Sequence, residues 1–231
     1  MYDPPVQIHK TVLMQRILDA VSRGYLLYTA GKVPADKAQR LAGKFATRYA
    51  VHRNENQRAY ARRKGRANAR LFLYAPPNDT DLRWWLCVTS GAGAVHELEK
   101  LADARNRHTR VWIEEDYELI QLSRKKGQGT GTVWTWRMTH GCDERWRLRL
   151  RHACRTPGTS EIRLAIGSLS RTPGFSGIRR QVGDLMVFAR AEWRRRHGNL
   201  DRFPGLLRLR YVERLSNTAV PLTAWKRRSS R

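Results

Sequence analysis

The hydrophobic pattern of this chain changes its period twice, and the order of the periods restricts the fold. Apolar side chains recur at helical spacing over residues 8–64 and again over 143–196, whereas over 69–138 they alternate or run together as in strands. Helices, then strands, then helices is the order of an α+β protein, not of a fold in which single strands and helices alternate. We therefore predict an α+β fold with a mainly antiparallel sheet of about five strands, flanked by N-terminal and C-terminal helices.

The N-terminal region predicts three helices. The first covers residues 8–27 and is followed by a turn at Ala30-Gly31-Lys32, and the second opens near Pro34 and carries an apolar stripe to Tyr49. The third covers 54–64 and ends at a glycine. A tri-helical start whose last helix is basic is also how many helix-turn-helix domains begin, so we keep a helix-turn-helix unit as an alternative.

The central and C-terminal regions supply the other elements. The strand candidates are 69–75, 82–89, 110–113, 117–122, 132–138 and 207–212, and the helix candidates are 94–105, 143–154, 160–169 and 176–196. We divide the chain into an N-terminal helical region (1–66), an antiparallel sheet region (67–139), a C-terminal helical region (140–214) and a basic tail (215–231). We expect one compact core overall and a disordered tail.

The composition allows a buried core and argues against a membrane protein. Apolar residues make up 41% of the 231 positions and include eight Trp. No run of about 18 apolar residues occurs, and no basic stretch followed by an apolar one opens the chain, so we expect a cytoplasmic protein without a membrane partner. Cys87, Cys142 and Cys154 form no CxxC pair, so we expect reduced or buried thiols instead of disulfides or a zinc site.

The net charge of the chain points to its partner. The sequence has 45 Lys and Arg against 20 Asp and Glu, a formal charge of +25. A protein this basic repels itself and attracts polyanions, so nucleic acid is the first partner to expect. An anionic membrane surface is the weaker alternative, because we find no basic amphipathic helix with a free apolar face.

The positive charge is densest between residues 53 and 70, where seven basic side chains face one acidic residue, Glu55. Such a density neutralises phosphates without reading a base sequence. A glycine-rich basic loop over 124–131, which also fits a plain β-hairpin connection, and the helix over 143–154 add further cations. The candidate nucleic-acid-binding residues are Arg53, Arg58, Arg62, Arg63, Lys64, Arg66, Arg70, Lys125, Lys126, Arg145, Arg149 and Arg151.

Two short segments offer candidates for catalysis. Paired carboxylates at Glu114 and Glu115 fit a Mg²⁺ site for nuclease chemistry, although an acidic turn is the simpler interpretation. His140 fits a general acid-base for metal-independent RNA cleavage, although the acids that follow it simply favour a helix N-terminus. We assign no catalytic residue, no metal and no cofactor, and we keep these three side chains as candidates for a nuclease alternative.

Three stretches of the chain carry a resemblance to known sequences. They are Gly24-Tyr25-Leu-Leu-Tyr28-Thr29-Ala-Gly31-Lys-Val33 with its continuation to Phe45, the stretch Trp134-Thr-Trp136-Arg137-Met138-Thr139, and Gly177-Ile-Arg-Arg-Gln-Val182. The chain resembles uncharacterised proteins carried by integrating conjugative elements and plasmids of proteobacteria. The resemblance implies a mobile-element context and supplies no catalytic residue.

Charge and resemblance together favour a nucleic-acid-binding accessory protein of a mobile genetic element, acting in replication, maintenance, transfer or defence. Two alternatives stay open. One is a metal-independent RNA-processing or other nuclease, and the other is a basic subunit of a nucleoprotein complex that also contacts other subunits. The sequence does not distinguish DNA from RNA as the ligand.

Overall fold

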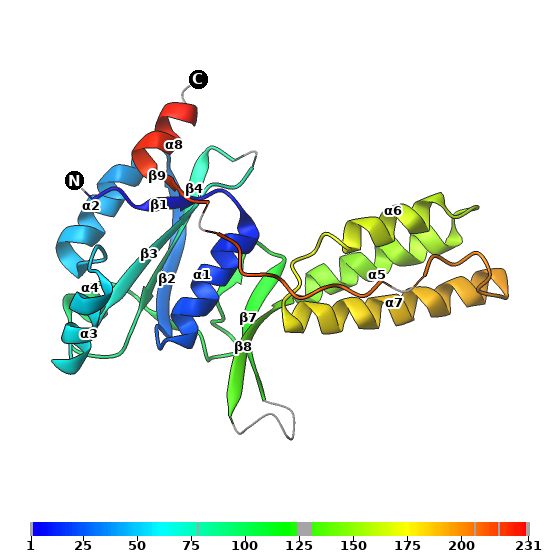
Figure 1. Cartoon of the computed structure of the whole chain (residues 1–231), viewed down its shortest axis with the longest axis horizontal. Coiled ribbons are helices and arrows are strands. Elements are labelled where there is room, and N and C mark those ends of the chain that lie inside the picture. The colour runs from blue at the N-terminus through cyan, green and yellow to red at the C-terminus, as the bar shows by residue number, and fades with distance from the viewer. Residues whose placement is uncertain (1, 78, 124–130, 206, 217, 230–231) are drawn as a thin grey trace. The chain divides into compact units, whose positions relative to one another are not determined.

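Helices and strands follow one another along the chain as in an α+β protein, which confirms the predicted fold class (Figure 1). The computed structural model describes residues 2–77, 79–123, 131–205, 207–216 and 218–229, with the last four by their backbone alone. The chain divides into two compact units. Unit 1 contains the residues up to Val111 and those from Arg214 onward, and unit 2 contains Trp112–Glu213.

Unit 1 is built on one sheet of six strands in the order β5-β2-β4-β3-β1-β9. Only the β1–β3 pair is parallel, and the other pairs are antiparallel. The strands are β1 (Pro5–Gln7), β2 (Leu27–Pro34), β3 (Ala69–Tyr74), β4 (Asp81–Val88), β5 (Ala102–Asp103) and β9 (Val220–Pro221). The helices are α1 (Lys10–Ser22), α2 (Ala38–Tyr49), α3 (Glu55–Arg63), α4 (Ala94–Leu98) and α8 (Leu222–Ser229).

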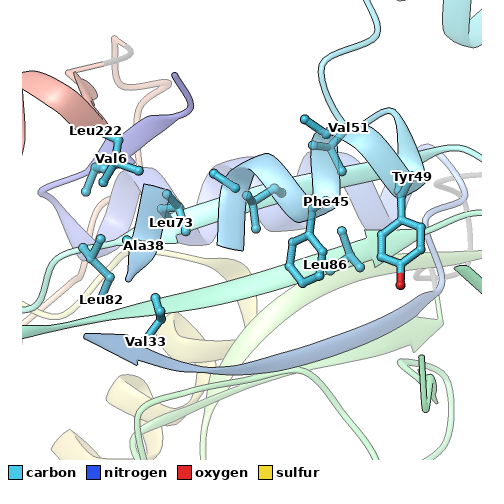
Figure 2. Close-up of a cluster of buried hydrophobic side chains, with 14 of the residues drawn as sticks. Val6, Val33, Ala38, Phe45, Tyr49, Val51, Leu73, Leu82, Leu86 and Leu222 are labelled. Carbon is cyan, nitrogen blue, oxygen red and sulfur yellow. The ribbon is translucent and has the colours of Figure 1, made fainter. Parts of the chain in front are cut away.

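Helix α2 buries one face of this sheet. Ala38, Ala42, Phe45 and Tyr49 recur at spacings of four, three and four, so they share one side of the helix, and all four are buried. They pack against side chains from the facing strands and from α8, among them Val6, Val33, Leu73, Leu82, Leu86 and Leu222 (Figure 2). The apolar stripe predicted for this helix is therefore the stripe that forms the core.

Helix α1 covers the opposite face of the sheet (Figure 1). Its residues Val12, Leu13 and Ile17 are buried but do not belong to the cluster beneath α2. Phe72 and Trp85 alternate with the residues that face α2, so they point toward the α1 side. The helix-turn-helix alternative is wrong, because a strand separates α1 from α2 and the two helices lie on opposite faces of the sheet.

The turn predicted at Ala30-Gly31-Lys32 is wrong, because these residues lie inside strand β2. Residues 27–34 pair continuously with β4, and Gly31 lies opposite Trp84. A Cβ atom at Gly31 would lie 2.9 Å from the Trp84 ring. The glycine therefore leaves room for a neighbouring indole inside a strand and does not mark a change of direction.

The other differences from the predicted elements concern short segments and the C-terminus. The helix predicted over 94–105 ends at Leu98, and no strand forms among the described residues of 207–212. The described part of the C-terminal tail forms β9 and α8 and is not disordered as predicted. The backbone N–H of Leu222 donates to the carbonyl of Pro4 at 3.1 Å. Strands of two or three residues such as β1, β5 and β9 are too short to produce a sequence period.

None of the helices described is long and apolar enough to cross a membrane.

Unit 2 joins a three-stranded antiparallel sheet to three helices. The strands are β6 (Trp112–Ile113), β7 (Tyr117–Ser123) and β8 (Thr132–Met138), and the helices are α5 (His140–Arg155), α6 (Ser160–Leu169) and α7 (Ser176–His197). The residues between 69 and 138 thus divide between two separate sheets, and the boundary after Val111 falls inside the region that we assigned to one sheet. Each unit buries apolar side chains of its own.

Helix α7 approaches β8 closely at Gly177. The backbone N–H of Gly177 donates to Oγ1 of Thr135 at 3.2 Å. One turn further on, Gln181 donates to the carbonyl of Met138 and accepts from its backbone N–H, at 3.0 and 2.7 Å. A Cβ atom at Gly177 would lie 2.5 Å from the carbonyl oxygen of Trp136, and that backbone atom cannot move aside without disturbing the strand.

We expect Gly177→Ala to destabilise unit 2 by about 1–3 kcal/mol, because the added methyl group overpacks the contact between helix and strand. Gly183→Ala, in the same helix, is the matched control, since nothing lies within 4 Å of its added Cβ. We expect the control to raise stability by up to about 1 kcal/mol through helix propensity. Urea unfolding of the full chain measures both, and equal effects of the two variants would contradict the close packing at Gly177.

The three thiols are buried, as the sequence led us to expect. Burial raises the pKa of Cys87 to about 12 and that of Cys142 and Cys154 to about 11. Because only the thiolate reacts with iodoacetamide, we expect no modification of the folded protein near neutral pH and modification of all three thiols after unfolding. Mass spectrometry after brief treatment checks this, and rapid labelling of a folded thiol would contradict it.

Candidate nucleic-acid interface

Helix α3 begins with a reciprocal cap between Asn54 and Gln57. The side chain of Asn54 accepts from the backbone N–H of Gln57, and the Gln57 side chain accepts from the backbone N–H of Asn54, both at 2.9 Å. This reciprocal cap satisfies two N–H groups that a helix otherwise leaves without partners. The helix ends at Arg63, and Gly65, two residues further on, has a positive φ of 67°, which suits glycine.

Five cations of this segment carry no carboxylate partner among the described residues. We call Arg53, Arg62, Arg63, Lys64 and Arg66 the α3 basic segment; the first is half-buried and the other four are exposed. Arg62 donates to the backbone carbonyl of Arg23 at 3.3 Å, and the Lys64 ammonium lies 5.8 Å from the centre of the Tyr60 ring. The one acid nearby, Glu55, pairs with Arg23 at 3.5 Å. Carboxylates of the described residues therefore leave the positive charge of the segment uncompensated.

Two other predicted nucleic-acid-binding residues, Arg58 and Arg70, line a small pocket beside β1 and β3. Arg16 of α1 lines the same pocket. Three arginines from three different elements therefore surround a space of about 200 Å³. We call this site the arginine pocket. Its other lining side chains include Tyr2, His52 and Phe72, and no Asp or Glu belongs to the lining.

The charge of Arg70 is poorly compensated. Burial lowers the pKa of Arg70 below its usual value, and the neighbouring charge of Arg58 lowers it further. The guanidinium lies 5.2 Å from the ring centre of Phe72 and 5.9 Å from that of Tyr25. Contacts with aromatic faces partly replace lost hydration, but they do not neutralise a cation.

The predicted arginines of unit 2 are engaged within that unit. Arg145 forms an ion pair with Asp116 at 2.6 Å, and Arg151 lies 3.9 Å from the carboxylate of Glu192. Arg149 donates to the hydroxyl of Ser168 at 3.0 Å and lies over the ring of Trp146. The carboxylates partly compensate the charges of Arg145 and Arg151, whereas Arg149 keeps its full charge. The predicted Lys125 and Lys126 lie outside the described residues.

The catalytic candidates lie on two segments of unit 2 that meet at Thr139. His140 is exposed in the first turn of α5, which Thr139 caps by accepting from the backbone N–H of Cys142 at 3.2 Å. Glu114 and Glu115 lie in the turn between β6 and β7, where Glu114 has a positive φ of 53° and the carbonyl of Glu115 accepts from the Thr139 hydroxyl. The described residues contain no group of three or more His, Cys, Asp or Glu side chains placed to hold a metal ion.

A second basic surface lies on the outer side of α2. It is a pocket of about 590 Å³ lined by the cations Lys37, Arg40, Lys44 and Arg48 together with apolar side chains such as Leu41. Lys44 pairs with Glu99 at 3.2 Å, so part of this charge is compensated within the protein.

Sequence reasoning missed Arg16, Tyr2 and His52 as members of the arginine pocket. Arg16 falls inside a helix that was correctly predicted, but nothing in its spacing links it to Arg58 or Arg70. Only the pairing of β1 with β3 and the packing of α1 bring these distant positions together.

Comparisons of the chain with protein-family models, with curated proteins and with solved structures gave no match.

We expect Arg70→Met to raise the unfolding temperature of the protein, because it removes a half-buried cation without a carboxylate partner and keeps most of the apolar side chain. Arg145→Met is the control, since it breaks the ion pair with Asp116, and we expect no rise. Thermal unfolding followed by circular dichroism measures both. A lower unfolding temperature for Arg70→Met would show that the charge of Arg70 is compensated after all.

Proposed function

We propose that this protein binds nucleic acid through unit 1 and serves as an accessory protein of a mobile genetic element in the cytoplasm. The mobile-element context rests on the resemblance described above. The binding itself rests on charge, and it needs contact with the phosphate backbone only, without readout of a base sequence.

The observation that carries the proposal is the gathering of cations without a carboxylate partner in one short segment, the α3 basic segment. The cations of the α3 basic segment have no carboxylate partner in the described part of the chain, whereas Arg145 and Arg151 of unit 2 each face one. A cation without a carboxylate partner gains more free energy from a phosphate contact than a cation that is already paired. Each phosphate that it neutralises also releases condensed counterions from the nucleic acid.

The geometry of the α3 basic segment fits this use. Arg62, Arg63 and Lys64 are consecutive and Arg66 follows the helix end, so their exposed side chains spread around the end of α3. Long flexible cations spread in this way can follow a phosphate backbone without requiring one fixed orientation of the bases.

We expect replacement of Arg62, Arg63, Lys64 and Arg66 by Gln to flatten the salt dependence of binding to duplex DNA. Each lost phosphate contact removes about 0.9 from the slope of log K against log salt. Fluorescence anisotropy with one labelled duplex over a series of salt concentrations measures the slope.

The matched control removes four exposed arginines of unit 2, namely Arg163, Arg190, Arg194 and Arg196. The two variants lose the same formal charge, so a long-range effect of net charge alone would change both slopes equally. We expect the control to keep most of the wild-type slope. Equal slopes for both variants, or an unchanged slope for the α3 variant, would reject unit 1 as the binding surface.

A further inference from the structure

The arginine pocket has a different character from the exposed cations around it. Three guanidinium groups line one small space, yet they come from α1, α3 and β3, and the rest of unit 1 holds these elements in place. Like charges gathered in this way repel one another, so the arrangement is costly for folding unless an anion fills the pocket.

The carboxylates near the pocket do not neutralise it. Asp19 lies 3.8 Å from the Arg16 guanidinium, but it also receives two shorter contacts from Arg214, at 2.6 and 3.1 Å. Arg58 and Arg70 have no carboxylate partner among the described residues. The pocket therefore carries a net positive charge.

Two nitrogen atoms of these arginines are buried without a hydrogen-bond acceptor in the described part of the chain. They are Nε of Arg58 and Nη1 of Arg16. Arg58 donates to the carbonyl of Val51 at 3.4 Å, and Arg16 donates to that of Leu215 at 2.8 Å. The Nη1 atom of Arg16 lies 3.8 Å from the Asp19 carboxylate, which is beyond hydrogen-bond distance. Buried donors left in this way favour a ligand that brings several acceptor oxygens.

The size of the pocket limits what it can hold. Its volume of about 200 Å³ lies below the range of about 300–1,000 Å³ typical of sites that enclose a whole small molecule. A phosphate group is compact, offers acceptor oxygens in several directions and matches the planar fork of a guanidinium.

We propose that the arginine pocket binds the terminal phosphate monoester of a nucleic-acid strand. An internal phosphodiester continues into the chain on both sides, whereas a terminal phosphate continues on one side only and can enter a small pocket. A phosphate monoester also carries about −1.5 to −2 charges at neutral pH, which suits three guanidinium groups better than the single charge of a diester.

Helix α3 carries cations that the rest of the bound nucleic-acid strand can contact. Arg58 and Arg62 are one turn apart on the same side of α3, so the α3 basic segment begins next to the pocket. A strand whose end is held by the three arginines would meet Arg62 with its following phosphates. This inference rests on the proposed function, and it adds that the protein recognises the end of a strand.

The test compares single-stranded oligonucleotides of one sequence that carry either a phosphate or a hydroxyl at the 5′ end, and a second pair that differs in the same way at the 3′ end. Fluorescence anisotropy with the full chain gives the ratio of affinities within each pair. We expect a preference of about tenfold or more for the phosphate at one of the two ends. Equal affinities within both pairs would overturn the proposal.

Variants separate the pocket from the general attraction of charge. We expect Arg70→Met, and independently Arg58→Gln, to bring the ratio close to one. The matched control Arg63→Gln removes an exposed cation outside the pocket, so it should weaken binding to both members of a pair and leave their ratio unchanged. A ratio that survives both pocket variants would overturn the assignment, provided that thermal unfolding shows them folded.

Inorganic phosphate distinguishes a failure of the pocket from a failure of the proposed function. If no oligonucleotide binds, the proposed function fails and strand-end recognition fails with it. A rise in unfolding temperature with inorganic phosphate, absent in Arg70→Met, would then still identify a site for free phosphate. If oligonucleotides bind with equal affinity whatever their ends, the proposed function stands and the pocket assignment alone is overturned.

Discussion

The alternation of side chains along β3 determines where the positive charge of unit 1 lies. Leu71 and Leu73 face α2 in the hydrophobic core, and the antiparallel ladder with β4 holds that register. Because neighbouring residues of a strand point to opposite faces, Arg70 lies on the side of α1. A shift of one residue would place its guanidinium among the apolar side chains beneath α2, which the cost of burying a charge forbids. The core thus places Arg70 beside Arg16 and Arg58.

Arginines with a carboxylate partner and arginines without one have different roles in the fold. In unit 2, carboxylates such as Asp116 and Glu192 accept from arginines, so those side chains contribute to the local structure. In unit 1, the α3 basic segment and the arginine pocket hold cations at positions where the surrounding structure offers backbone carbonyls and aromatic rings instead. A surface that keeps its cations uncompensated gives up some stability, which is the usual consequence of maintaining a binding site.

The sequence predicted the parts of the fold that have a long period. Helix α2 and strand β8 each repeat their pattern often enough to be recognised, and both were found where they were expected. β2 was missed because Gly31, which makes room for Trp84, has the appearance of a turn residue. The arginine pocket was not predictable, since Arg16 and Arg70 are distant in sequence and only the completed sheet brings them together. Charge density alone pointed to Arg58 and Arg70, without indicating that they share a site.

The most direct test of the account is an arginine footprint of the wild-type protein with and without bound nucleic acid. Phenylglyoxal modifies exposed guanidinium groups, and mass spectrometry reports the extent of reaction at each position. We expect a bound strand to protect Arg62, Arg63 and Arg66, while Arg163 and Arg194 of unit 2 react as before. Protection confined to unit 2, or no protection at any arginine at low ionic strength, would contradict it.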